Sequence, residues 1–232
     1  YVEEIGGRPV KKSDKFWTVY RLGDYILIRT TCPVTEDCRE ALLIIRPGEK
    51  SWDIIIDSSS DSIDPLCYPL DGLLIFYITA LNGDIFIHGS AARNKKSAYL
   101  FTGRSGRGKT TIAGICSRAG WEVIHDDRLI LRKKKDRIVV YNTPVYDDEI
   151  PVEAELSCIY VLNHGQDNSS VRIDHSEAMA AIMANCIQHH WDPGLIGRLT
   201  GSILDLVNNI TVRSLYFVPD ASVITFIEND EC

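Results

Sequence analysis

Residues 101–111 read FTGRSGRGKTT, and this stretch decides the fold. From Gly103 to Thr110 it fits the pattern G-x-x-x-x-G-K-[ST] in full. The apolar run at 98–101 predicts a strand before the glycines, and the pattern over 109–119 predicts a helix after them. A strand, a glycine-rich turn and a helix in this order form the arrangement in which backbone N–H groups cradle phosphates.

Each residue type in the motif has a physical reason. Gly103, Gly106 and Gly108 allow positive φ, so successive N–H groups can point inward toward an anion. The helix that follows directs the positive end of its dipole at the same place. Lys109 is expected to bridge the outer phosphates of ATP, and the Thr110 hydroxyl to hold Mg²⁺. The predicted nucleotide-binding residues are Gly103, Arg104, Ser105, Gly106, Arg107, Gly108, Lys109, Thr110 and Thr111.

Two arginines in this set have a second interpretation. The guanidinium groups of Arg104 and Arg107 match phosphate oxygens in pairs and are candidates for phosphate clamps. They are equally compatible with solvated side chains on the outer side of the loop, and taken alone their position favours that interpretation.

A pair of acids follows at a short interval. Asp126 and Asp127 lie 17 and 18 residues after Lys109, at the expected end of a strand over 121–124. One helix and one strand are enough to bring the chain back beside the loop. One carboxylate can then reach the metal and the other can accept a proton from an attacking hydroxyl. The alternative is an Asx-type turn before Arg128.

His88 ends an apolar run at 85–88. If this run pairs with the strand expected over 97–101, His88 lies near the mouth of the loop. A single histidine at a strand end is more often structural than catalytic, so its spacing alone leaves both roles open.

The rest of the chain predicts an α/β fold with a mixed sheet, preceded by a β-rich segment. The polar stretch 58–62 suggests two parts, a β-rich segment over 1–60 and a core with the phosphate loop over 61–232. Besides the strands above, we expect strands at 16–22, 25–30, 41–46, 52–57, 129–131, 138–141, 156–162, 212–217 and 223–227. We expect further helices at 69–81, at 178–189 after a capping box formed by Asp174 and Glu177, and from 192 to 209.

Composition excludes several classes. The formal charge of −7 argues against a nucleic-acid-binding protein, which needs a basic face. The longest apolar run, 73–81, is too short for a membrane span of ~20 residues. Seven scattered cysteines are typical of a reduced, cytoplasmic protein rather than a disulfide framework.

Three segments together resemble the catalytic core of the HPr kinase/phosphorylase family. They are FIHGSA at 86–91, FTGRSGRGKTT at 101–111 and GWEVIHDDRLIL at 120–131. The phosphoenolpyruvate carboxykinases are more distant relatives with a similar loop followed by Asp-Asp. The resemblance is good over 84–142 and weaker over the closing VRSLYFVPDASVITFIE at 212–228. It implies a fold like that of the carboxykinases and the C-terminal part of HPr kinase.

The resemblance also implies roles for single residues. Asp127 would deprotonate the acceptor hydroxyl, with His88 as its partner, and Lys109 would bridge the phosphates. Thr110 would be a metal ligand, and Asp126 would lie near the metal or the lysine. The family's further metal-binding glutamate has two alternative candidates here, Glu153 or Glu155 in PVEAEL at 151–156.

Two departures separate this chain from ordinary HPr kinases. The loop ends in Lys-Thr-Thr, where those kinases carry Lys-Ser-Glu, and the C-terminal Pro-Val-Arg-Pro-Gly segment used in dephosphorylation is absent. We therefore expect a phosphotransferase that uses ATP and Mg²⁺ to phosphorylate a hydroxyl, a serine of a protein or peptide other than HPr. A small-molecule kinase and a nucleotide-dependent switch or ATPase are the alternatives. The family's habit of assembly leaves a homo-oligomer open, and residues 1–60 are expected to form a lid or a docking surface.

Overall fold

The structure of the 232-residue chain is a computed structural model. The structure describes residues 11–12, 17–30, 38–58, 69–95, 97–144, 150–187, 192–230 and 232. The chain divides into two compact units, 1–81 with 190–192, and 82–189 with 193–232. The first unit includes the helix that follows the polar stretch, up to Leu81.

The first unit contains an antiparallel five-stranded sheet in the order β1-β2-β3-β4-β5. Its strands are β1 (Lys11–Lys12), β2 (Trp17–Leu22), β3 (Tyr25–Thr30), β4 (Cys38–Ile45) and β5 (Asp53–Ser58). Gly23 and Gly48 take φ values of 59° and 87° in the β2–β3 and β4–β5 turns, at the two turns predicted from Gly-Asp and Pro-Gly. Helix α1 spans Leu70–Asn82, and its residues up to Leu81 belong to this unit. It confirms the helix expected at 69–81.

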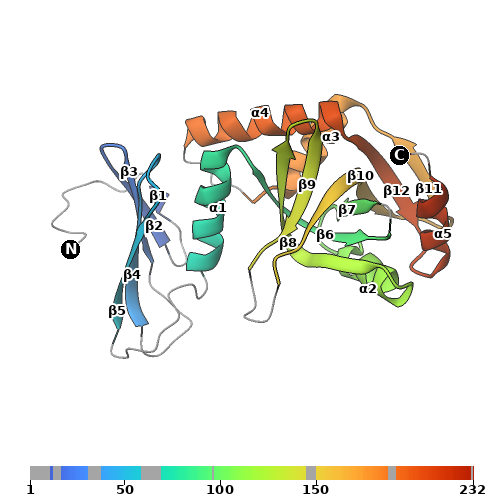
Figure 1. The fold of residues 1–232 in the computed structure, drawn as a ribbon, viewed down its shortest axis with the longest axis horizontal. Helices are drawn as coiled ribbons and strands as arrows, with labels where there is room; N and C mark the ends of the chain where they lie inside the picture. The colour runs from blue at the N-terminus through green and yellow to red at the C-terminus, as the bar shows by residue number, and fades with distance from the viewer. Residues whose placement is uncertain are drawn as a thin grey trace. The chain divides into compact units, whose positions relative to one another are not determined.

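The second unit is built on a mixed seven-stranded sheet in the order β11-β12-β10-β7-β6-β8-β9 (Figure 1). Strand β10 runs parallel to both β7 and β12, and the other pairs are antiparallel. The strands are β6 (Ile85–Arg93), β7 (Ala98–Thr102), β8 (Glu122–Lys134), β9 (Arg137–Asn142), β10 (Glu153–His164), β11 (Ser169–Arg172) and β12 (Thr211–Phe217). The predicted α/β class with a mixed sheet is therefore present.

Helices cover both faces of this sheet. They are α2 (Lys109–Arg118), α3 (His175–Asn185), α4 (Pro193–Asn209) and α5 (Ser222–Asn229). Alternate residues of a strand point to opposite faces, so each central strand serves two cores. In β10, for example, Ile159 packs in the core that contains residues of α3 and α4, whereas Tyr160 packs with residues of α2 and α5. Figure 1 shows α3 and α4 together on one side of the sheet and α2 on the other.

Asp174 starts α3 as predicted. Its carboxylate accepts hydrogen bonds from the backbone N–H groups of Ser176 and Glu177, at 2.8 and 2.9 Å. These bonds satisfy donors that the first helical turn leaves without partners.

The structure corrects two predictions about elements. Residues 223–227 were expected to form a strand, but they lie in α5. The Asp220 carboxylate accepts a hydrogen bond from the Ser222 N–H at 2.8 Å, which fixes the entry to the helix. The strand expected over 121–124 continues as β8 to Lys134, so Asp126 and Asp127 lie within a strand rather than at its end.

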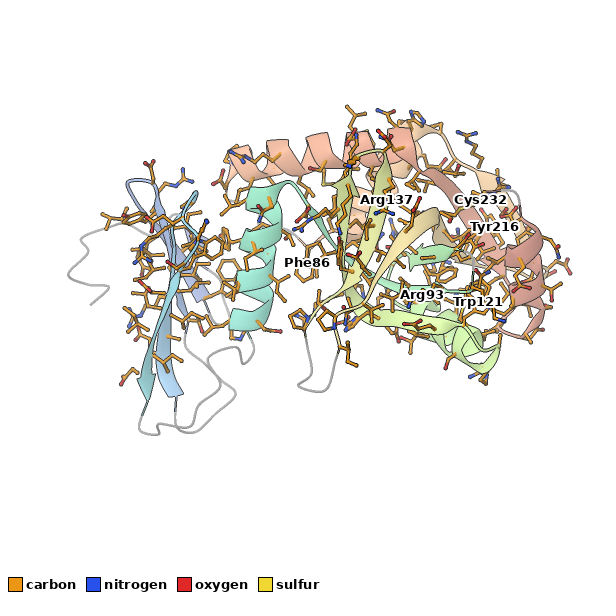
Figure 2. All side chains as sticks on the ribbon, in the orientation of Figure 1. Phe86, Arg93, Trp121, Arg137, Tyr216 and Cys232 are labelled. Atoms are coloured by element: carbon orange, nitrogen blue, oxygen red, sulfur yellow. A yellow bond between two sulfur atoms is a disulfide. The ribbon has the colours of Figure 1, made fainter. Side chains whose placement is uncertain are left out.

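The structure also corrects the expectation that the cysteines are reduced. Cys158 of β10 and Cys232 at the C-terminus form a disulfide, and Cys232 is labelled in Figure 2. Among the other described residues, Cys116 and Cys186 are free thiols. None of the described helices has the length and apolar character needed to cross a membrane.

Candidate functional site

The glycine-rich loop connects β7 to α2, which is the predicted strand–loop–helix order. Gly103, Gly106 and Gly108 all take positive φ, at 147°, 79° and 93°. A side chain at Gly108 would also meet a neighbour, because its Cβ would lie 2.8 Å from Cζ of Phe217. Glycine is therefore required there for both backbone conformation and space.

Lys109 is the first residue of α2 and is 9% exposed. Its ammonium group donates to the carbonyl of Gly103 at 2.9 Å. Burial lowers the pKa of Lys109 below its ordinary value, and the nearby carboxylates of Asp126 and Asp127 partly oppose that shift. The lysine and both acids are therefore close enough to interact electrostatically.

Strand β6 lies between the strand that leads into the loop and the strand that carries the acids. Gly89 of β6 is in register with Thr102 of β7 on one side and with Asp127 of β8 on the other. The sequence predicted that the acids return beside the loop. In the structure the acids lie on β8, with β6 and its His88 between β8 and β7.

His88 and Asp127 form the central pair of the site. The ring Nδ1 of His88 lies 3.0 Å from a carboxylate oxygen of Asp127 and 2.8 Å from the Asp127 carbonyl oxygen. Both oxygens are acceptors, so Nδ1 carries the proton and donates. The carbonyl of His88 in turn accepts from the Thr102 hydroxyl at 3.0 Å, which connects the pair to the end of β7. His88 and Asp127 are 43% and 52% exposed, so both remain accessible to a ligand.

Two basic residues flank the acids on β8. Arg128 Nε lies 3.4 Å from the second carboxylate oxygen of Asp127. The Arg128 backbone N–H donates to Nδ1 of the buried His125 at 3.2 Å, so the proton of the neutral imidazole lies on Nε2. Both contacts lie within the segment of β8 that carries the acids.

Two further residues, which the sequence did not single out, contact the loop and the start of α2. The hydroxyl of Ser90, which is in register with Asp126, donates to the Lys109 carbonyl at 3.0 Å. His164 ends β10, and its Nε2 lies 3.1 Å from the Gly106 carbonyl oxygen. His164 ends the apolar strand β10, and that position was the signal available for it. His88 was expected to end its strand in the same way, but β6 continues to Arg93, so His88 lies within the strand.

The two glutamates considered for the metal do not belong to this site. Glu153 begins β10, and the loop lies at the opposite end of that strand, where Val161 pairs with Thr102. Eight residues of strand separate Glu153 from Val161, or about 26 Å. Lys134 contacts the Glu153 carboxylate at 2.9 Å and holds its pKa below the ordinary value, and Arg137 pairs with Glu155 at 3.3 Å.

The oxygen groups near the loop suit Mg²⁺. Magnesium in phosphate sites binds through one or two carboxylates, hydroxyls and phosphate oxygens, and keeps several waters. Thr110, which is exposed at the start of α2, and the carboxylates of Asp126 and Asp127 supply such oxygens. Within the described residues, no group of three or more His, Cys, Asp or Glu side chains forms a metal cage.

Comparison with known proteins gives a distant likeness to solved structures. No family model matches the chain, and no curated protein matches it. Among solved structures, an HPr(Ser) kinase/phosphatase from Coxiella burnetii aligns with 62% of this chain and 91% of its own, with 12% sequence identity and a TM-score of 0.35. These values indicate a distant structural relationship and assign no activity to the chain.

Proposed function

We propose that this protein is an ATP- and Mg²⁺-dependent kinase that transfers the γ-phosphoryl group to a hydroxyl, a serine of a protein or peptide. The observation that carries the proposal is the hydrogen-bonded pair of His88 and Asp127, aligned across three neighbouring strands with the glycine-rich loop. A phosphate-binding loop alone serves many nucleotide-binding proteins. A carboxylate held beside it adds a base for an acceptor.

Each end of the proposed site has its own task. The N–H groups of the loop and the ammonium of Lys109 bind the phosphates and neutralise their charge. In the ligand-free loop that ammonium is bonded to the Gly103 carbonyl, so it would exchange this acceptor for a phosphate oxygen. Thr110 and Asp126 would hold Mg²⁺, which supplies further charge neutralisation at the phosphates.

Asp127 is the proposed base. Its carboxylate takes the proton of the acceptor hydroxyl while the oxygen of that hydroxyl forms a bond to the γ-phosphorus. The bond between the γ-phosphorus and the bridging oxygen breaks, and ADP leaves with the electron pair. His88 donates to one carboxylate oxygen and is therefore assigned the orientation of the base. The second oxygen, which lies 3.4 Å from Nε of Arg128, is the one proposed to take the proton.

Asp127→Asn tests the proposal. Incubation with γ-labelled ATP and arrayed serine peptides should give a labelled product with the wild-type protein. Asp127→Asn should lower kcat at least about 100-fold, since positioned bases contribute on the order of 10²–10⁴, and leave the Kd for MgATP within about threefold. Asp136→Asn, an exposed acid in the β8–β9 turn, is the matched control and should change neither value.

The outcomes separate the alternatives. Full transfer by Asp127→Asn would overturn the mechanism. Labelled metabolites and no labelled peptide would identify a small-molecule kinase. ATP hydrolysis without any phosphorylated acceptor would identify a switch or ATPase. The lid or docking role of residues 1–60 stays a prediction.

A further inference from the structure

The end of β10 follows the glycine-rich loop closely. Val161 pairs with Thr102, and the next residue, Leu162, places its backbone N and O each 3.4 Å from where a Cβ of Gly103 would lie. His164 is the last residue of the strand, and its Nε2 lies 3.1 Å from the carbonyl oxygen of Gly106. Strand β10 therefore meets the loop at both its start and its middle.

The contact at Gly106 fixes the orientation of one peptide unit. A carbonyl oxygen only accepts, so Nε2 of His164 carries the proton and donates. In a trans peptide the C=O and the following N–H point in opposite directions. With the Gly106 carbonyl turned toward His164, the N–H of Arg107 is turned back over the loop, where it donates to the Arg104 carbonyl at 3.2 Å.

Two donors in the loop are therefore bonded to the loop's own carbonyls. The Arg107 N–H is bonded to Arg104, and the Lys109 ammonium is bonded to Gly103 and lies 3.5 Å from the Arg104 carbonyl. Backbone N–H groups and the lysine of such a loop are the groups that receive phosphate oxygens. Both donors therefore lie near the Arg104 carbonyl, and His164 bonds the peptide that carries one of them.

We propose that His164 is a positioning residue for nucleotide phosphate binding. Its Nε2–H holds the Gly106–Arg107 peptide with the Arg107 N–H turned back over the loop, where that N–H would exchange the Arg104 carbonyl for a phosphate oxygen. This inference rests on the proposed function, because it assigns a role within the same phosphate site. It adds a residue that is 55 positions beyond Lys109 in the chain and that belongs to none of the motifs in the sequence.

Calorimetric titration tests the inference with two probes, MgATP and inorganic tripolyphosphate, which lacks a base and a ribose. His164→Ala should weaken both by about 3- to 10-fold, the effect of one lost neutral hydrogen bond. His164→Gln should stay within about twofold of the wild-type protein, because its amide N–H reaches the same carbonyl. His175→Ala, which removes an exposed histidine at the start of α3, should change neither Kd.

Hydrogen exchange of the Arg107 amide in the ligand-free proteins gives a second measurement. It should be faster in His164→Ala and restored in His164→Gln. The inference is overturned if His164→Ala binds both probes as the wild-type protein does, or if the glutamine variant is as weak as the alanine variant. A wild-type protein that binds neither probe would overturn the proposed function, and this inference with it, before any variant is compared.

Discussion

His88 and Asp127 lie 39 residues apart in the sequence, and the His88 ring places Nδ1 3.0 Å from the Asp127 carboxylate. They occupy the adjacent strands β6 and β8, where His88 is in register with Arg128 and Gly89 is in register with Asp127. Because Nδ1 also donates to the Asp127 carbonyl at 2.8 Å, the ring is held by two acceptors of one residue. The histidine therefore bonds the aspartate through Nδ1 at two of its oxygens.

This geometry predicts a graded effect of substitutions at His88. His88→Ala should lower kcat about 10- to 100-fold, the range expected for the loss of a hydrogen bond to a charged group. His88→Asn should retain most of the activity, because its amide N–H can replace Nδ1–H. Steady-state kinetics at fixed MgATP measure both. If alanine and asparagine variants are equally active, the pair has no role in transfer.

Substitution of Lys109 should change both the pH dependence of stability and the affinity for MgATP. Its folded pKa is lowered by burial, so between that value and the ordinary lysine value the unfolded chain binds more protons. The free energy of unfolding should then rise with pH as the pH approaches the ordinary lysine value. Lys109→Met removes this dependence, so the wild-type protein should gain stability relative to the variant between pH 8 and pH 10.

Urea denaturation of both proteins at the two pH values measures that difference. Calorimetry should show at the same time that Lys109→Met weakens MgATP binding at least about tenfold, because a charge-assisted bond to phosphate is lost. If the stability of the wild-type protein relative to Lys109→Met fell from pH 8 to pH 10, burial would not be disfavouring the charged form of Lys109.

The sequence was sufficient where local chemistry decides structure. The glycines at 103, 106 and 108 require positive φ, and all three adopt it. Likewise Gly-Asp and Pro-Gly gave the two turns of the N-terminal sheet, and Asp174 gave the start of α3. In each case the deciding residues are near neighbours in the chain, so their pattern contains the necessary information.

The sequence was insufficient where distant segments decide structure. The run VITFI at 223–227 has the β-branched residues of a strand, but Val223, Ile224 and Ile227 pack as one helix face in the core shared with α2. The position of β6 between β7 and β8 depends on pairings across the sheet. For the same reason, the contact of His164 with Gly106 is visible only once β10 lies beside β7.

Gly108 predicts a large loss of stability from a small change. Gly108→Ala places a Cβ 2.8 Å from Phe217 at φ 93°, so clash and backbone strain add, and we expect a loss of about 1–3 kcal/mol. Gly197→Ala is the matched control, because Gly197 lies in α4 with open space around it and should gain about 0.5–1 kcal/mol. Denaturant unfolding measures both, and equal effects at the two glycines would contradict the required conformation at Gly108.

The disulfide predicts a redox-dependent stability. Cys158 lies in the central strand β10 and Cys232 ends the chain, so the bridge closes a loop with a sequence separation of 74. Closing such a loop restricts the unfolded chain, and reduction should lower the free energy of unfolding by about 2–4 kcal/mol. Denaturation with and without dithiothreitol measures the change, and Cys232→Ser should be as stable as the reduced wild-type protein and insensitive to the reductant. Alkylation of the untreated, denatured protein followed by mass measurement provides the direct check: Cys158 and Cys232 should remain unmodified, whereas modification of both would show that the protein is isolated with these cysteines reduced.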